Sequence, residues 1–161
     1  MLMRNLIIVS GHCGTTLKAA QLLADKIGGA DIFDTSGDAG GIDFSAYDNY
    51  IFGSNVRMFM LNPRFKKWSS RLRGFYRNKR VYGYLIGCME QNDRLLSKFA
   101  KKLAGNRGTV YAGGEFVEGD AAGRFASMYS NMKNDCLQKG NALPYIREAE
   151  LDKLAEAILQ K

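Results

Sequence analysis

The chain has 161 residues, of which 46% are hydrophobic and 24% charged, with two prolines and a formal net charge of +7. This length and composition predict one globular domain, residues 1–161, and exclude a disordered or fibrous chain. No apolar run reaches the roughly 18–20 residues of a membrane span, and the MLMRN segment before the first apolar run does not resemble a signal peptide, so we expect a cytoplasmic location.

Apolar strands and amphipathic helices alternate along the chain. The predicted strands are residues 6–10, 30–34, 50–53, 81–87 and 109–112, and the predicted helices are 17–27, 62–72, 92–104, 125–132 and 151–158. This alternation predicts an α/β fold, a three-layer sandwich in which a five-stranded parallel sheet has helices on both faces. Ligands bind such sheets beyond the carboxyl ends of the strands, which directs attention to segments 10–16, 53–62, 87–92 and 112–119.

The first of these segments is the most informative. Its sequence, Ser10 followed by GHCGTT, joins a buried strand directly to an amphipathic helix. Backbone N–H groups and hydroxyls in such a loop point to one spot at the positive end of the helix dipole. The pattern therefore predicts an anion site, and phosphate is the usual anion.

Four phosphate chemistries can be compared with this loop, and none fits. A P-loop needs a lysine beside its last glycine, but Lys18 falls inside the helix. A dinucleotide loop needs G-x-G-x-x-G, which Gly11 and Gly14 do not satisfy. A cysteine phosphatase would use Cys13 with an arginine six residues later, where Ala19 stands, and a phospho-acceptor receiver would need acids after the first and third strands. The remaining chemistry is a phosphate monoester held by N–H groups and hydroxyls.

At this point the sequence resembles the flavodoxin family. Gly14-Thr15-Thr16 followed by Ala20 and Leu23 is similar to the second half of the flavodoxin signature, and YLIGCMEQND looks like the second flavin loop. Val56-Arg57 after a Gly-Ser-Asn turn, and VYAGGEF with the following Phe/Met/Tyr-rich helix, resemble the protoporphyrinogen-dehydrogenase-like branch. The resemblance implies a flavodoxin-like fold that binds flavin mononucleotide (FMN) without a covalent link.

The resemblance also implies three groups of cofactor-binding residues. The phosphate loop would be Ser10, Gly11, His12, Cys13, Gly14, Thr15 and Thr16; the loop along the ring would be Ser54, Asn55, Val56, Arg57, Met58 and Phe59; and the pyrimidine edge would meet Gly87, Cys88, Met89 and Asn92, with Gln91 as a further partner. Arg57 would face the flavin N1/C2-carbonyl end or a substrate carboxylate, unless it is simply solvated. Met58 and Phe59 are open to a second interpretation, as packing or partner-contact residues. No side chain is assigned as catalytic acid, base or nucleophile; His12 in particular is more typical of a hydrogen-bond donor.

Three functions remain open. The first is an FMN-dependent oxidoreductase of the protoporphyrinogen-dehydrogenase type that passes electrons to a quinone. The second is an electron carrier that docks on a redox partner protein. The third is a flavin-free binding protein, because Gly11 and Cys13 stand where the loop usually carries hydroxyls.

Residues 64–80 hold eight basic residues and no acidic one. This segment predicts contact with an acidic partner or with an anionic membrane at its inner face, unless it is only a solvated helix face; nucleic acid is the weakest candidate, since no binding motif accompanies it. The three cysteines are an odd number, so we expect no disulfide framework, with Cys88 and Cys136 in the core and Cys13 as a packed residue or an oxidation-prone thiol. One histidine and no Cys-x-x-Cys supply too few ligands for a metal site.

Overall fold

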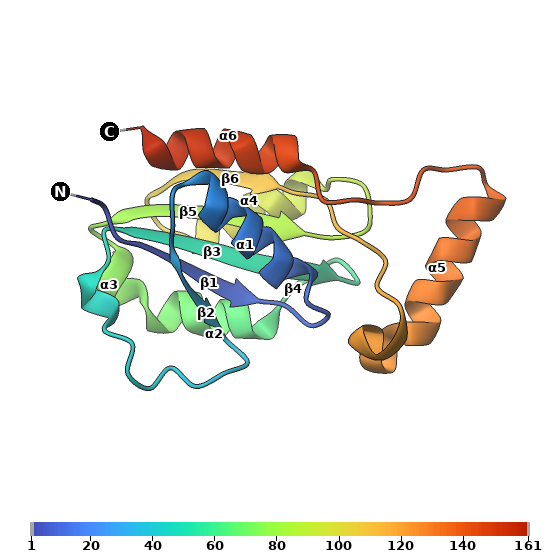
Figure 1. The fold of residues 1–161 in the computed structure, drawn as a ribbon, viewed down its shortest axis with the longest axis horizontal. Coiled ribbons are helices and arrows are strands. Elements are labelled where there is room, and N and C mark those ends of the chain that lie inside the picture. The colour runs from blue at the N-terminus through green and yellow to red at the C-terminus, as the bar shows by residue number, and fades with distance from the viewer. Residues whose placement is uncertain (1, 161) are drawn as a thin grey trace.

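A sheet of five parallel strands forms the centre of the protein in a computed structural model that describes residues 2–160 (Figure 1). In spatial order the strands are β2 (Asp31–Asp34), β1 (Asn5–Ser10), β3 (Asn49–Arg57), β5 (Arg80–Ile86) and β6 (Asn106–Tyr111). Counted over the parallel strands alone, this is the 2-1-3-4-5 order of flavodoxin-like doubly wound sheets. The predicted fold class is confirmed. The two terminal residues of the predicted domain, Met1 and Lys161, lie outside the described residues.

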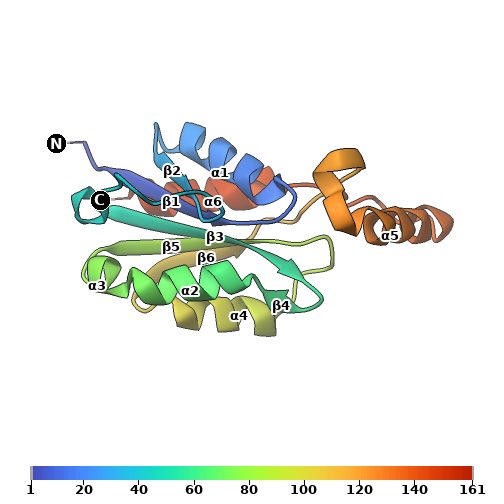
Figure 2. The same cartoon turned by 90° about the horizontal axis from the view of Figure 1, so that it is seen from below.

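Helices cover both faces of this sheet (Figure 2). One face carries α1 (Thr15–Lys26) and α6 (Glu148–Leu159), and the other carries α2 (Pro63–Arg71), α3 (Arg73–Tyr76) and α4 (Asp93–Lys102). Asn62 caps α2 as predicted, accepting a 2.9 Å hydrogen bond from the Arg64 N–H, with Pro63 in the first helical position. Across residues 2–160, no helix combines the length and the apolar character that crossing a bilayer requires.

The core consists of two apolar layers, one on each side of the sheet. Successive residues of β1 alternate between them: Leu6 and Ile8 face the α2–α4 side, and Ile7 and Val9 face the α1–α6 side. All four are at most 1% exposed, as expected of a parallel strand that is buried on both faces. This double burial explains why the strand is one unbroken apolar run in the sequence.

Strand β3 is longer than predicted. It continues past Gly53 because Ser54 pairs with Ser10 of β1 and Leu85 of β5, so a polar stretch is held in the sheet by its neighbours. Its last residues then pair with a short antiparallel strand, β4 (Met60–Leu61). The segment expected as a loop is therefore a β-hairpin at the carboxyl edge of the sheet.

The chain between β6 and α6 leaves the sheet and returns to it. It contains a 3-10 turn, η2 (Gly119–Phe125), and helix α5 (Ala126–Gln138), which projects beyond the carboxyl edge (Figures 1 and 2). No residue of α5 is buried. We call residues 113–147 the arm. A second 3-10 turn, η1 (Phe44–Ala46), precedes β3, and neither turn was predicted, because such short turns carry little sequence periodicity.

Candidate functional site

The loop between β1 and α1 has the backbone geometry of an anion site. Gly14 precedes α1 in a left-handed conformation, with a φ of 86°, and no side chain caps the helix. The first N–H groups of α1 therefore remain open to a ligand. Gly11 has no room for a side chain, because a Cβ there would lie 2.7 Å from Thr16 Oγ1.

The hydroxyls of this region differ in their availability. Ser10 is 1% exposed, and its hydroxyl lies 2.9 Å from that of Thr35. Ser54 is fully buried and accepts a hydrogen bond from the Asn62 N–H at 3.3 Å. Thr15 and Thr16, in contrast, line the cavity described below. The serines thus connect segments of the fold; of the two threonines, Thr15 is half-buried at the cavity wall, whereas Thr16 is only 2% exposed.

Three arginines surround His12. The sequence did not indicate this cluster. Arg64 donates a hydrogen bond to the Gly11 carbonyl, and both Arg57 and Arg124 stack on the ring of Phe125. The His12 ring lies 5.9 Å from the same phenyl ring. Residues from three distant segments therefore place positive charge beside the anion loop.

This surrounding charge affects the His12 imidazole. Burial lowers its pKa below the usual value, and the positive charges of the three arginines lower the pKa further. His12 Nε2 lies 3.3 Å from the Asn62 amide nitrogen, which can only donate, so the ring nitrogen accepts and the imidazole is neutral. Asn62 also donates to Asn55 Oδ1 at 2.8 Å and thereby joins β3, α2 and the loop.

The guanidinium of Arg57 has an unsatisfied donor. Its carbon lies 3.8 Å from the centroid of Phe125. Its Nη1 is buried without a hydrogen-bond partner, one of two such side-chain atoms in residues 2–160. A buried donor of this kind is costly unless a ligand completes it, and an anionic oxygen is the natural partner. Arg57 thus lies beside His12, at the end of the site that contains the anion loop.

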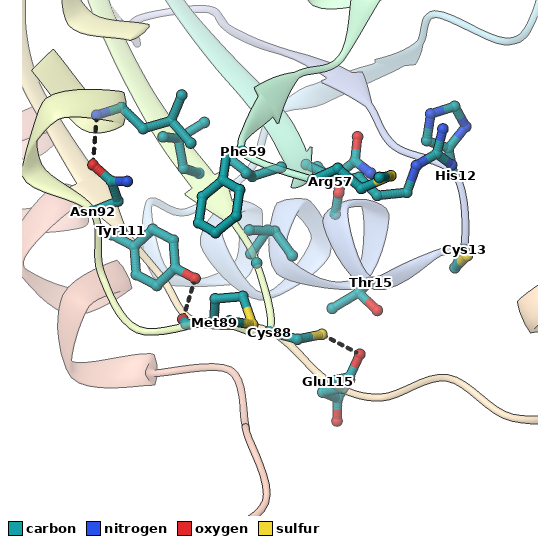
Figure 3. A pocket seen from close by; sticks show the side chains of 18 of the residues that line it. His12, Cys13, Thr15, Arg57, Phe59, Cys88, Met89, Asn92, Tyr111 and Glu115 are labelled. Carbon is teal, nitrogen blue, oxygen red and sulfur yellow. Dashed lines mark hydrogen bonds between the residues drawn. The ribbon is translucent and has the colours of Figure 1, made fainter. Parts of the chain in front are cut away.

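A cavity extends from this cluster along the carboxyl edge of the sheet (Figure 3). His12, Cys13, Thr15 and Arg57 lie at one end, and Phe59, Met89, Asn92 and Tyr111 lie at the other. Thirteen predicted residues line it: His12, Cys13, Thr15, Thr16, Asn55, Val56, Arg57, Met58, Phe59, Gly87, Cys88, Met89 and Asn92. Ser10 and Ser54 are buried and do not line it, whereas Gly11 and Gly14 line a neighbouring pocket that also includes His12 and Arg64. The three predicted loops therefore meet at one place.

The hairpin tip forms the outer edge of this cavity. Met58 and Phe59 connect β3 to β4 with φ values of 50° and 60°, and they are 78% and 69% exposed. A two-residue turn with both residues in the left-handed region is a type I′ turn, which normally contains Asn and Gly. Bulky residues in this conformation are strained, and such strain is found most often at functional sites.

The arm supplies several of the cavity residues that the sequence did not place in the site, and the others come from β5, β6, loop 87–92 and α4. Met128, Tyr129 and Met132 of α5 line the cavity, as does Glu115, which also belongs to the arm. Tyr111, at the end of β6, lines the cavity from outside the arm. The helical spacing of the α5 residues indicated only an apolar face. The Tyr111 hydroxyl donates to the Met89 carbonyl at 2.6 Å and so holds loop 87–92, and burial raises the pKa of Tyr111 to about 12.

Loop 87–92 is also fixed by other contacts. The Gly87 N–H donates to the Gly113 carbonyl at 2.9 Å, so this N–H is already used. Asn92 caps α4 by accepting from the Leu95 N–H at 3.1 Å. Gln91 donates to Asp93 Oδ1 at 2.9 Å and does not line the cavity.

The expectation that Cys88 and Cys136 lie in the core is wrong, since both are only partly buried. Cys88 lines the cavity, and its Sγ lies 3.1 Å from the Glu115 carbonyl, to which the thiol donates. Burial, together with the nearby Cys13 and Glu115, raises the pKa of Cys88 to about 11, so the thiol stays protonated at neutral pH. Cys136 lies on the projecting helix, and the apolar core that would cover it does not extend there.

A second groove adjoins the cavity on the other side of loop 87–92. It shares Phe59, Met89 and Met132 with the cavity and continues to Leu143 and Tyr145 of the arm. These five large side chains give it an apolar wall. The site thus offers two connected spaces: a cavity with an anion-binding end, and a groove that combines this apolar wall with polar and charged residues such as Asp135 and Arg147.

Residues 6–120 match the family model described as the flavodoxin domain. The chain belongs to this flavodoxin domain family. The match includes the anion loop, the hairpin and loop 87–92, and it ends in the 3-10 turn before α5. No curated protein matches the sequence.

Solved flavodoxins share the fold of this family member at low sequence identity. A short-chain flavodoxin associated with a bacterial microcompartment has a TM-score of 0.58 at 13% identity, covering 99% of this chain and 97% of that one. A Lactobacillus acidophilus flavoprotein solved with FMN has a TM-score of 0.57 at 15% identity, covering 68% and 93%. Flavodoxin 1 of Bacillus cereus has a TM-score of 0.53 at 14% identity, covering 81% and 97%. These similarities establish the fold.

Proposed function

We propose that the protein binds FMN at the carboxyl edge of its sheet and uses it to transfer electrons or hydride. The observation that carries this proposal is the unsatisfied Nη1 of Arg57 beside the open N-terminus of α1. A phosphate monoester would accept from both, and it would offset the positive charge of the three arginines near His12. The structure of an FMN-bound flavoprotein of the same fold supports the choice of ligand.

Different residues of the protein would bind the phosphate and the ring of the ligand. Arg57, Thr15, Thr16 and the first N–H groups of α1 would hold the phosphate. The apolar hairpin tip and the α5 residues would cover the ring and exclude water from it. FMN supplies the redox chemistry when bound, and the chain binds and orients it.

We further propose that this protein is an oxidoreductase with a bulky substrate rather than a simple electron carrier. The supporting observation is the second groove, whose apolar wall lies directly beside the cavity. A carrier needs no such space. The motif resemblance favours the protoporphyrinogen-dehydrogenase type with a quinone as acceptor.

The visible spectrum of the purified protein tests FMN binding. A yellow protein, or a colourless one that takes up added FMN in equimolar amount, supports the proposal. A protein that does not take up FMN contradicts it and favours the flavin-free binding protein. Protoporphyrinogen oxidation with a quinone acceptor then tests the finer assignment. Absence of turnover, together with fast reduction by a flavodoxin reductase, would identify an electron carrier.

A further inference from the structure

The charge of the protein is divided between the two faces of its sheet. Residues 63–79 and 93–102, which contain α2, α3 and α4, hold eleven Lys and Arg against a single Asp, a net charge of +10. The whole chain carries +7, so the remaining residues together carry −3. Helices α2, α3 and α4 all lie on one face of the sheet (Figure 2). The opposite helices, α1 and α6, hold three Lys against five acidic residues.

Ten of these basic residues form what we call the cationic face: Lys66, Lys67, Arg71, Arg73, Arg77, Lys79, Arg94, Lys98, Lys101 and Lys102. All are exposed except Lys102, which is half-buried. Within residues 2–160, every ion pair involves other basic residues, so none of these ten has an acidic partner. Repulsion between like charges so close together destabilises the fold unless a partner of opposite charge neutralises them.

Apolar side chains are exposed on and beside this face. Phe75 of α3 lies between Arg73 and Arg77 in the sequence and is 44% exposed. An open groove lined by Arg73 and four basic residues of α4 ends at Phe59 of the hairpin tip. Phe59 also lines the cavity, so the cationic face continues to the mouth of the proposed FMN site.

We propose that the cationic face binds an anionic lipid surface. Exposed basic residues that attract lipid head groups, together with apolar side chains that enter the interface, are the composition of peripheral membrane-binding surfaces. Six of the ten basic residues are lysines, which are depleted at the centres of protein–protein interfaces. Both features favour lipid over an acidic protein. Lipid binding would bring the cavity mouth close to a membrane-dissolved acceptor; only this last consequence rests on the proposed function.

Sedimentation of the protein with lipid vesicles tests the proposal without FMN. We expect at least about 10-fold stronger binding to phosphatidylcholine vesicles that contain about 30% phosphatidylglycerol than to pure phosphatidylcholine vesicles. This difference should disappear when the salt concentration rises from about 0.1 M to about 1 M, because charges at the surface are then screened. The FMN titration is a separate measurement, so failure of one proposal leaves the other standing.

Two matched quadruple variants locate the binding surface. Lys67→Gln, Arg71→Gln, Lys98→Gln and Lys101→Gln together should lower binding to anionic vesicles on the order of 100-fold or more. Arg107→Gln, Lys133→Gln, Lys139→Gln and Lys153→Gln remove the same charge elsewhere and should lower it less than about 3-fold. Circular dichroism and thermal unfolding check that both variants fold.

A second pair of variants tests the contribution of apolar side chains to vesicle binding. Phe75→Ser should weaken vesicle binding severalfold without changing its salt dependence, because the phenyl ring contributes through apolar contact. Leu159→Ser, at an exposed position of α6, should have no effect.

Two results would overturn the proposal. The first is equal loss of binding in the two quadruple variants, which would show that net charge alone matters. The second is a wild-type protein that binds immobilised polyglutamate but not anionic vesicles, which would assign the face to an acidic protein.

Discussion

Replacing Arg57 by methionine should weaken FMN binding but leave riboflavin binding nearly unchanged. Arg57→Met keeps the length of the side chain and its packing on Phe125 but removes the unsatisfied guanidinium donor. A hydrogen bond that involves a charged group contributes about 1.5–3 kcal/mol. This corresponds to a Kd for FMN about 10- to 150-fold higher. Riboflavin has no phosphate, so its Kd should change less than about 3-fold.

Titration of the apoprotein, followed by quenching of flavin fluorescence, measures both constants. Arg124→Met is the matched control, because its guanidinium lies 4.9 Å from the same phenyl ring but its side chain is exposed. Loss of this solvent-screened charge should raise the Kd for FMN less than about 3-fold. Equal weakening of FMN and riboflavin in Arg57→Met would place this arginine at the ring. Unchanged FMN affinity would show that the guanidinium does not contact the ligand.

Three further predictions concern the same edge of the sheet. His12, the sole histidine, should titrate below its usual pKa in apoprotein NMR spectra, and FMN should raise this pKa because the phosphate offsets the arginine charges that disfavour the imidazolium. Replacing Met58-Phe59 by Asn-Gly should increase the free energy of unfolding by about 2 kcal/mol in urea denaturation, since Asn-Gly adopts the type I′ turn without strain, and it should also weaken FMN binding. FMN should slow proteolytic cleavage within Ala126–Gln138, since α5 buries no residue in the free protein and presents Met128, Tyr129 and Met132 to the cavity that FMN would fill.

Each of these has an outcome that contradicts it. A His12 pKa that FMN leaves unchanged would separate the imidazole from the phosphate site. Equal stability of the Asn-Gly variant and the wild type would show that the hairpin tip is unstrained. Cleavage of α5 at the same rate with and without FMN, while cleavage elsewhere slows, would show that this helix does not cover the ligand.

The fold was predictable because its strands are buried on both faces. Leu6–Val9 is one apolar run, and helix starts such as Asn62-Pro63 carry their capping residues in the sequence. The extension of β3 past Gly53 was not predictable in the same way. The polar residues Ser54 and Asn55 are in the sheet because β1 and β5 already lie on either side, which is a tertiary effect.

The same reasoning applies to the site. The loop around Gly14 could be found because its motif is local, and the three predicted loops meet because the carboxyl ends of parallel strands share one edge. The arginine cluster around His12 comes from residues 52 and 112 positions away, Arg64 and Arg124, and no local pattern connects them. The spacing of Met128 and Tyr129 predicted an apolar helix face. It did not indicate which surface of the protein this face contacts.

The conflicts between local preference and observed structure gather at one place. Met58 and Phe59 adopt a conformation that suits Asn and Gly, the Arg57 guanidinium lacks a partner, and α5 buries none of its residues. Elsewhere, as in β1, pattern and burial agree. A single ligand would resolve all three conflicts, since an anionic oxygen completes the guanidinium and a flat apolar ring covers the exposed tip and the inner side of α5. Features that destabilise the free protein are therefore placed where binding can offset them, as expected where an edge is adapted to a ligand rather than to stability.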